Sequence, residues 1–118
     1  MQARRRTEAY RQLMGAPGYD LNLDIVTVAP DGRFASFALG WMDSLNNVGE
    51  FEPVGTRPEF QGKGLGKAVL LEGLRRMKAR GVTEAIVYVE AENPAAQRLY
   101  ASVGFRPVNR IYTYVKDV

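Results

Sequence analysis

The chain has 118 residues and a formal net charge of +3, and it contains neither Cys nor His. This length matches one domain, and a chain with 46% hydrophobic and 25% charged residues has the composition of an ordinary globular protein. The missing Cys and His exclude disulfides, thiolate nucleophiles, the usual catalytic triads and most transition-metal sites. Any chemistry must therefore use carboxylates, Tyr, Ser or Thr, Lys or Arg, and backbone amides. We predict one domain over residues 1–118, with no metal site.

Charge is unevenly distributed along the chain. Residues 15–56 have a net charge of −5, whereas residues 57–81 have a net charge of +5. A basic segment indicates a phosphate-bearing partner, but it is also typical of a solvated helix face. The residues to which this alternative applies are Arg75, Arg76, Lys78 and Arg80. Aromatic and basic residues do not interleave in the basic segment, so nucleic acid is not the expected partner.

The N-terminal region shows no sign of a membrane or export segment. No apolar run approaches the ~20 residues that a membrane span needs. The N-terminus is basic, but no apolar stretch follows it as in a secretory signal. We therefore expect a cytoplasmic location and no membrane partner.

The first part of the chain reads as a helix followed by a hairpin. Apolar residues at helical spacing predict a short helix over residues 4–14. Alternating apolar residues predict strands over residues 21–28 and 34–41. The turn-forming residues 30–32, Pro-Asp-Gly, lie between these strands. The two strands are therefore expected to form a hairpin.

A third strand, a glycine-rich segment and a long helix follow. Pro53 lies inside the strand expected over residues 48–56, and because Pro has no N–H group we place it at a bulge or an unpaired edge. The helix after the glycine-rich segment has an apolar stripe that predicts its buried face. That stripe comprises Leu70, Leu71, Leu74 and Met77. Gly81 is placed to end the helix.

The last part of the chain adds a strand, a helix and a final strand. An apolar strand is expected over residues 85–91, and Asn93 followed by Pro is a typical helix start. This helix is expected to run to Val103 and to stop at Gly104. A final strand is predicted over residues 111–115. The order of elements predicts an α/β (α+β) fold in which helices pack on a mixed sheet.

The glycine-rich segment has the composition of an anion-binding loop. Residues 62–66 hold three alternate glycines between a strand and a helix, and the amides of a helix start bind anions. Lys63 and Lys67 add positive charge. The segment is not a P-loop, because Ala68 stands where Ser or Thr is needed, and its third glycine falls one place early for a dinucleotide fingerprint. We predict a phosphate cradle of another kind; a structural hinge would have the same pattern.

Two motifs resemble those of the GNAT family of N-acetyltransferases. The acyl-CoA signature of that family, Gln/Arg-x-x-Gly-x-Gly/Ala, is met by Gln61, Gly64 and Gly66. Residues 93–105 resemble its second motif, Asn-x-x-Ala-x-x-Leu-Tyr-x-x-x-Gly-Phe. The resemblance covers residues 50–105 closely. It implies the acyl-CoA N-acyltransferase fold, with a mixed, mostly antiparallel sheet flanked by helices.

The front of the chain departs from the family pattern. Residues 49–56, preceded by Trp41-x-Asp43, resemble the C-terminal unit of a bacterial subgroup that often occurs in longer or tandem chains. The family usually opens with a strand and a helix before the element expected at residues 4–14, and both are missing here. A minimal version, a fragment and a neighbouring chain that supplies the missing piece are all open. Because an open sheet edge invites pairing, we predict a homodimer or another partner that supplies the missing edge.

The resemblance implies an acetyl-CoA-dependent N-acetyltransferase. Members of the family transfer the acetyl group directly to a primary amine, here of a small molecule or peptide, without a covalent enzyme intermediate. The pyrophosphate would lie on the amides of residues 61–67, and the pantetheine arm would follow the third strand where it separates from the strand at 85–91. The implied cofactor-binding residues are Val54, Thr56, Gln61, Gly62, Lys63, Gly64, Leu65, Gly66, Lys67 and Asn93. A non-catalytic acyl-CoA-binding module, or half of a tandem acetyltransferase, is the alternative.

The candidate catalytic residues are a tyrosine and two carboxylates. Tyr100 matches the position of the family's general acid. Glu50 and Glu52 lie two apart on one strand face, and either can be the base that accepts the proton of the amine; both can also be plain solvated residues. Trp41 is interpreted as a core residue, with a place beside Asp43 in the acceptor pocket as the alternative. The acidic segment before residue 56 favours a cationic acceptor.

Overall fold

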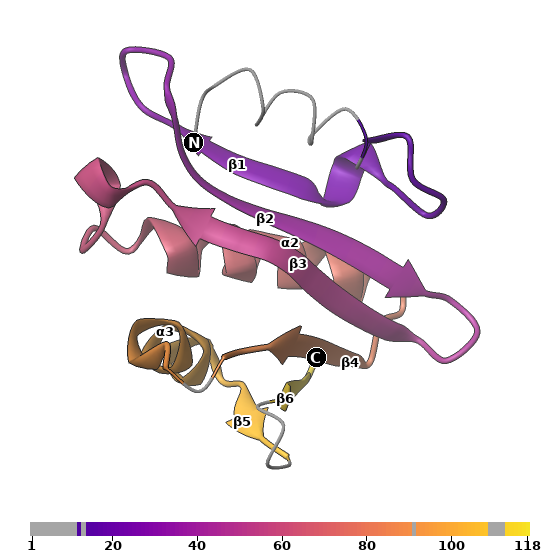
Figure 1. Cartoon of the computed structure of the whole chain (residues 1–118). Coiled ribbons are helices and arrows are strands. Elements are labelled where there is room, and N and C mark those ends of the chain that lie inside the picture. The colour runs from indigo at the N-terminus through magenta and orange to yellow at the C-terminus, as the bar shows by residue number, and fades with distance from the viewer. Residues whose placement is uncertain (1–11, 13, 91, 109–112) are drawn as a thin grey trace.

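The described strands form one mixed sheet. Figure 1 shows the computed structural model, which describes residues 12, 14–90, 92–108 and 113–118. The strands are β1 (Asp24–Val28), β2 (Phe34–Asp43), β3 (Val48–Thr56), β4 (Glu84–Tyr88), β5 (Arg106–Pro107) and β6 (Thr113–Asp117), arranged in the order β1-β2-β3-β4-β6-β5. Among these strands only β3 and β4 pair in parallel. The expected mixed, mostly antiparallel sheet is therefore confirmed. The helix expected over residues 4–14 lies, apart from residues 12 and 14, outside the described residues.

The expected hairpin is confirmed, but its first strand begins later than expected. β1 and β2 pair antiparallel, with Ile25 opposite Ala38. Residues Leu21–Leu23 form a 3-10 turn, η1, instead of the start of a strand. The carboxylate of Asp20 accepts a hydrogen bond from the Asn22 amide at 2.9 Å. This local side-chain bond competes with extended structure, which explains the error in the expected boundary.

The bulge expected at Pro53 is confirmed. On β2 and β3, Ala38 faces Val54 and Gly40 faces Phe51, so Leu39 lies opposite both Glu52 and Pro53. The Glu52–Pro53 peptide is cis. The bulge leaves the second half of β3 paired with β2 but not with β4, whose pairing with β3 ends at Glu50.

Helix α2 (Leu65–Ala79) packs across the sheet and lies behind β2 and β3 in Figure 1. Leu70, Leu74 and Met77 are buried, as expected, but Leu71 is 47% exposed. The expected place of Leu71 in the stripe is wrong because each residue turns 100° about the helix axis, which carries Leu71 off the face that Leu70 occupies. The buried stripe is completed by Gly66, Val69 and Gly73.

Helix α3 (Pro94–Val103) has the expected ends. The Asn93 side chain accepts a hydrogen bond from the Ala96 amide at 3.1 Å, and Gly104, with φ of 106°, ends the helix. The strand expected over residues 85–91 ends at Tyr88, so Val89 and Glu90 leave the sheet.

The C-terminal strands differ from the expectation in their bounds. The final strand runs from Thr113 to Asp117, and positions 111 and 112 of the expected strand lie outside the described residues. The short strand β5, which pairs Arg106 with Val115, was not expected. Two residues are too few to show a pattern of alternation.

Close packing of α2 on β3 depends on a glycine. A Cβ atom built on Gly73 would lie 2.5 Å from Cε1 of Phe51, whose side chain is only 3% exposed. Overpacking costs about 1–3 kcal/mol, whereas the higher helix propensity of Ala returns about 1 kcal/mol. We expect Gly73→Ala to lower the free energy of unfolding, measured by urea denaturation, by up to about 2 kcal/mol.

The matched control for this prediction removes the ring. In the double variant Gly73→Ala with Phe51→Leu, the loss of stability should be smaller than the sum of the single losses, because the added methyl group no longer meets the aromatic ring. A Gly73→Ala protein as stable as the parent would show that α2 moves away from β3 without cost.

Candidate functional site

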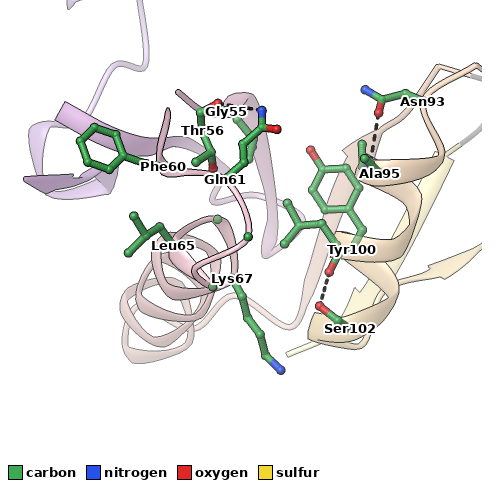
Figure 2. A pocket seen from close by; sticks show the side chains of 16 residues that line it. Gly55, Thr56, Phe60, Gln61, Leu65, Lys67, Asn93, Ala95, Tyr100 and Ser102 are labelled. Atoms are coloured by element: carbon green, nitrogen blue, oxygen red, sulfur yellow. Dashed lines mark hydrogen bonds between the residues drawn. The ribbon is translucent and has the colours of Figure 1, made fainter. Parts of the chain in front are cut away.

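A cavity of about 570 Å³ opens where β3 and β4 separate. The two strands pair only from Val48 to Glu50 on β3, and beyond that point the second half of β3, the glycine loop and α3 surround the cavity. We call it the main cavity. Residues predicted from the sequence that line it are Val54, Thr56, Gln61, Gly62, Gly64, Leu65, Gly66, Lys67, Asn93 and Tyr100. The fold therefore brings these ten residues, from three separate segments, to one place (Figure 2).

The glycine loop presents open backbone to the main cavity. Gly62 and Gly64 have φ angles of 80° and 76°, and a Cβ atom built on either would meet no atom within 4 Å. Gly64 is the N-cap of α2 and offers no side chain to the first-turn amides of that helix. These amides have no partner within the helix, so they can bind an anion. The loop therefore has the open backbone that an anion-binding site needs.

Buried contacts hold the loop against β2. Ser36 is 1% exposed, and its hydroxyl lies 3.0 Å from the Leu65 carbonyl oxygen, to which it donates, and 2.6 Å from Oγ1 of Thr27. The Gln61 side chain donates to the Thr56 carbonyl oxygen at 3.4 Å. These bonds fix the start of α2 relative to the end of β3.

Most of the basic segment lies away from the main cavity. Lys67 lines it, but the ammonium group of Lys63 lies 5.8 Å from the ring centroid of Phe60, and Lys63 does not line it. Farther along α2, Arg75 and Arg76 both bind Glu72. Arg80 pairs with Asp20. The alternative of a partly ion-paired, solvated helix face therefore describes the arginines of α2.

Tyr100 stands at the wall of the main cavity. Its side chain is 6% exposed and packs edge-on against Phe105, with ring centroids 5.8 Å apart. The ring of Tyr114 also lies near that of Tyr100, with centroids 6.5 Å apart. Burial raises the pKa of the Tyr100 hydroxyl above its usual value of 10, so the group is protonated at neutral pH. Figure 2 shows the ring extending from α3 toward the segment that carries Thr56 and Gln61.

A second cavity of about 330 Å³ adjoins the first. We call it the acidic cavity, because its charged lining residues are Glu52 and Glu90. The other residues that line it are Phe51, Pro53, Val54, Tyr88, Val89, Asn93, Ala96 and Tyr100. Four of these, Val54, Asn93, Ala96 and Tyr100, also line the main cavity. The two cavities are therefore parts of one cleft, with Tyr100 at their boundary.

Glu50 lies beside the cleft and lines neither cavity. It is half-buried and directly opposite Trp41 on β2. Because Phe51 points toward Gly73 on α2, Glu50 and Glu52 point away from that helix. Burial, and then the charge of Glu52, raise the pKa of the Glu50 carboxyl above its usual value of 4.5.

The structure corrects the interpretations of Trp41 and Asp43. Trp41 is partly exposed instead of core, and its indole N–H donates to the Glu52 carbonyl oxygen at 2.8 Å. Its ring meets Tyr19 edge-on at 6.4 Å. The Asp43 carboxylate accepts hydrogen bonds from the Leu45 and Asn46 amides and lines neither cavity. Asp43 therefore holds the turn between β2 and β3.

Several lining residues were not predicted. Ala96 and Leu99 lie inside the second motif, and Phe60 directly precedes the glycine loop, so the motifs themselves could have pointed to them. Tyr88 and Glu90 belong to no motif, and they line one cavity with Glu52 because β3 and β4 are neighbouring strands of the sheet. No local pattern could have found these two.

The described residues show neither a metal cluster nor a membrane-spanning helix. In the part of the chain that the structure describes, no group of three or more acidic side chains could hold a metal ion. Among the helices with described residues, none is long and apolar enough to cross a membrane.

Curated relatives have one name in common. The chain is 38% identical over 104 residues to a mycothiol acetyltransferase of Kineococcus radiotolerans, a match that covers 88% of this chain and 33% of that protein. It is 44% identical over 69 residues to a mycothiol acetyltransferase of Saccharomonospora viridis, covering 58% of this chain and 22% of the relative. The chain thus spans between about a fifth and a third of the length of these relatives.

Solved structures share the fold. The PaiA N-acetyltransferase of Thermoplasma acidophilum in complex with coenzyme A superposes with a TM-score of 0.68 at 25% identity, over 76% of this chain and 57% of that one. Ard1 of Thermoplasma volcanium superposes with a TM-score of 0.79 at 18% identity, over 92% of this chain and 77% of that one. The sequence model of the Acetyltransferase (GNAT) family matches residues 4–105. With its two motifs, its sheet and its cleft in agreement, the chain belongs to the GNAT acetyltransferase family.

Proposed function

We propose that this chain, as a single domain over residues 1–118, binds acetyl-CoA in the main cavity and transfers the acetyl group to a primary amine of a small molecule or peptide. The observation that carries the proposal is the cleft itself, which has the glycine loop at one end and the largely buried Tyr100 at its wall. The family and its CoA-bound relative support acetyl-CoA as the cosubstrate. We also propose that the protein acts in the cytoplasm, as expected from the sequence.

The residues of the cleft have distinct proposed roles in binding. The amides from Gln61 to Lys67 hold the pyrophosphate, Lys63 through its backbone and Lys67 also through its side chain. Val54 and Thr56 lie along the pantetheine arm, on the part of β3 that β4 leaves unpaired. The side-chain Oδ1 of Asn93 caps α3, which leaves the Nδ2 group of the same side chain to donate to the arm.

The proposed transfer forms one bond and breaks one bond. The neutral amine attacks the thioester carbonyl carbon, a C–N bond forms, the C–S bond breaks, and the thiolate leaves as coenzyme A. Tyr100 donates the proton that the thiolate needs, and Glu50 or Glu52 accepts the proton that the amine loses. Tyr100 is protonated at neutral pH and so has a proton to give. The raised pKa of Glu50 moves that carboxyl toward the range in which a base accepts a proton effectively.

Tyr100→Phe tests the proposed acid. The variant keeps the ring that packs on Phe105 but removes the hydroxyl, so we expect kcat to fall on the order of 10²-fold, the lower end of the contribution of general acid–base catalysis. The Kd for CoA, measured by calorimetry, should not change. Acetyl transfer is followed by thiol release, with a broad panel of primary amines as acceptors.

Two outcomes would contradict the proposal. A kcat that Tyr100→Phe leaves unchanged would remove the hydroxyl from the mechanism. CoA binding by the parent chain without transfer to any amine of the panel would favour the alternative, a non-catalytic acyl-CoA-binding module or half of a tandem acetyltransferase.

The two glutamates differ in their expected pH behaviour, and this ranks them as bases. If Glu50 is the base, kcat/KM rises with pH as Glu50 loses its proton, with a midpoint above 4.5 because its pKa is raised. Glu50→Gln should abolish this rise. Glu52→Gln should keep the rise but shift its midpoint to lower pH, since it removes a nearby negative charge that raises the pKa of Glu50. The opposite result, loss of the rise only in Glu52→Gln, would assign the base to Glu52.

We also propose that the chain forms a homodimer through β1. Within the described sheet β1 is an edge strand, with β2 as its strand partner, and Val28 on it is 56% exposed. Open edges pair with other chains unless a charge blocks them. Light scattering at micromolar concentration should give twice the 13.1 kDa mass of the chain, and Val28→Lys should restore the single mass. A monomeric parent protein would refute this proposal.

A further inference from the structure

The acidic cavity has a charge that the transfer reaction alone does not explain. Its charged lining residues are two exposed carboxylates, those of Glu52 and Glu90, and no Lys or Arg among the described residues lines it. Within the described residues, neither carboxylate forms an ion pair with a basic side chain. Two carboxylates that line one cavity give it a negative potential, which attracts cations.

The two carboxylates come from backbones that diverge. Glu52 lies at the bulge of β3, where the Trp41 indole donates to its carbonyl oxygen at 2.8 Å. Glu90 follows β4, and its carbonyl oxygen accepts the Asn93 amide at 3.1 Å in the turn before α3. Both positions are therefore tied to the framework of the cleft by their backbones. A ligand that reaches both carboxylates must span the opening between β3 and α3.

The acidic cavity adjoins the proposed site of transfer. It shares Tyr100 and Val54 with the main cavity, but it contains no residue of the glycine loop. Its volume of about 330 Å³ is at the small end of ligand pockets. Tyr88, which is 58% exposed, also lines it and offers an aromatic ring to a cation. This end of the cleft suits the acceptor, whereas the other end suits the phosphates.

The proton balance of the reaction distinguishes Glu90 from the two glutamates proposed as bases. The amine that attacks must be neutral, so its own positive charge is gone when the bond forms. Whichever of Glu50 and Glu52 takes this proton becomes neutral, whereas Glu90 keeps its charge throughout. A second ammonium group on the acceptor can therefore pair with Glu90.

We infer that the acceptor carries two cationic groups, and that Glu90 selects it by binding the group that is not acetylated. The inference rests on the proposed function and names its substrate class: a small diamine, or an amine beside a basic side chain. Glu90 is a specificity residue in this scheme and takes no part in proton transfer. Tyr88 covers the bound cation from the side of β4.

The test compares two acceptors of the same carbon chain, n-butylamine and its α,ω-diamine, with the purified chain at saturating acetyl-CoA. We expect a lower KM for the diamine. Glu90→Gln should raise the KM of the diamine about fivefold, the loss of roughly 1 kcal/mol that an accessible ion pair contributes, and should leave its kcat and the KM of n-butylamine unchanged. Glu90→Asp should restore part of the preference.

Glu92→Gln is the matched control. Glu92 is also exposed and lies two residues away, but it lines neither cavity. Its removal changes the net charge equally, so an effect of long-range charge alone would appear in both variants. Equal KM values for the two acceptors, or equal effects of Glu90→Gln and Glu92→Gln, would overturn the inference.

Equilibrium binding separates this inference from the proposed function. Calorimetry measures the diamine and n-butylamine on the chain saturated with CoA, where no transfer can occur. If no amine is acetylated but the diamine binds more tightly than n-butylamine, and Glu90→Gln removes the difference, the proposed function fails. The inference that Glu90 binds a second cationic group is then supported. If both amines are acetylated but they bind equally in parent and variant, the function stands and the inference fails.

Discussion

The separation of β3 from β4 is the constraint on which the rest of the molecule depends. These strands pair in parallel through only three residues, Val48 to Glu50, and then part. The bulge that places Glu52 and Pro53 opposite Leu39 keeps β3 bound to β2 while its other edge is free. A continuous sheet would leave no cleft, because paired strands lie under 5 Å apart. The ten predicted residues that line the main cavity surround this opening.

Close packing of α2 on β2 and β3 stabilises the sheet in which the opening lies. α2 lies against β2 and β3 through Gly73, Gly49 and Gly40, where side chains of Phe51 and Met77 fill the space a Cβ would take. Ser36, buried and bonded to the Leu65 carbonyl, ties the first turn of α2 to β2. The sheet therefore keeps its shape although two of its central strands part. The same contact of Ser36 with Leu65 also fixes the glycine loop at one end of the cleft.

Local chemistry explains which elements the sequence predicted well. The bounds of α3 were predicted correctly because an Asn cap and a Gly stop act through their own backbone or nearest neighbours. The bulge in β3 was predicted because Pro53 has no N–H group to donate. The strand start at Leu21 was wrong because the Asp20 side chain bonds the Asn22 amide. Trp41 and Leu71 were misplaced because burial depends on what packs over a residue. In the cleft, motifs brought the glycine loop and Tyr100 together, but Tyr88 and Glu90 become neighbours of Glu52 only in three dimensions.

The two ends of the cleft have opposite electrostatic character. Backbone amides, the start of α2 and Lys67 make one end attractive to phosphates, while Glu52 and Glu90 make the other attractive to cations. Tyr100 lies between these two ends and is largely buried, and this burial raises the pKa of its hydroxyl. Burial raises the pKa of a carboxyl group for the same reason, because it disfavours the charged form. Glu50 on β3 has such a raised pKa, although it lines neither cavity. Burial beside the parting of the strands therefore raises the pKa values of both a tyrosine and a carboxyl group, and in the proposed reaction the first would give a proton and the second would take one.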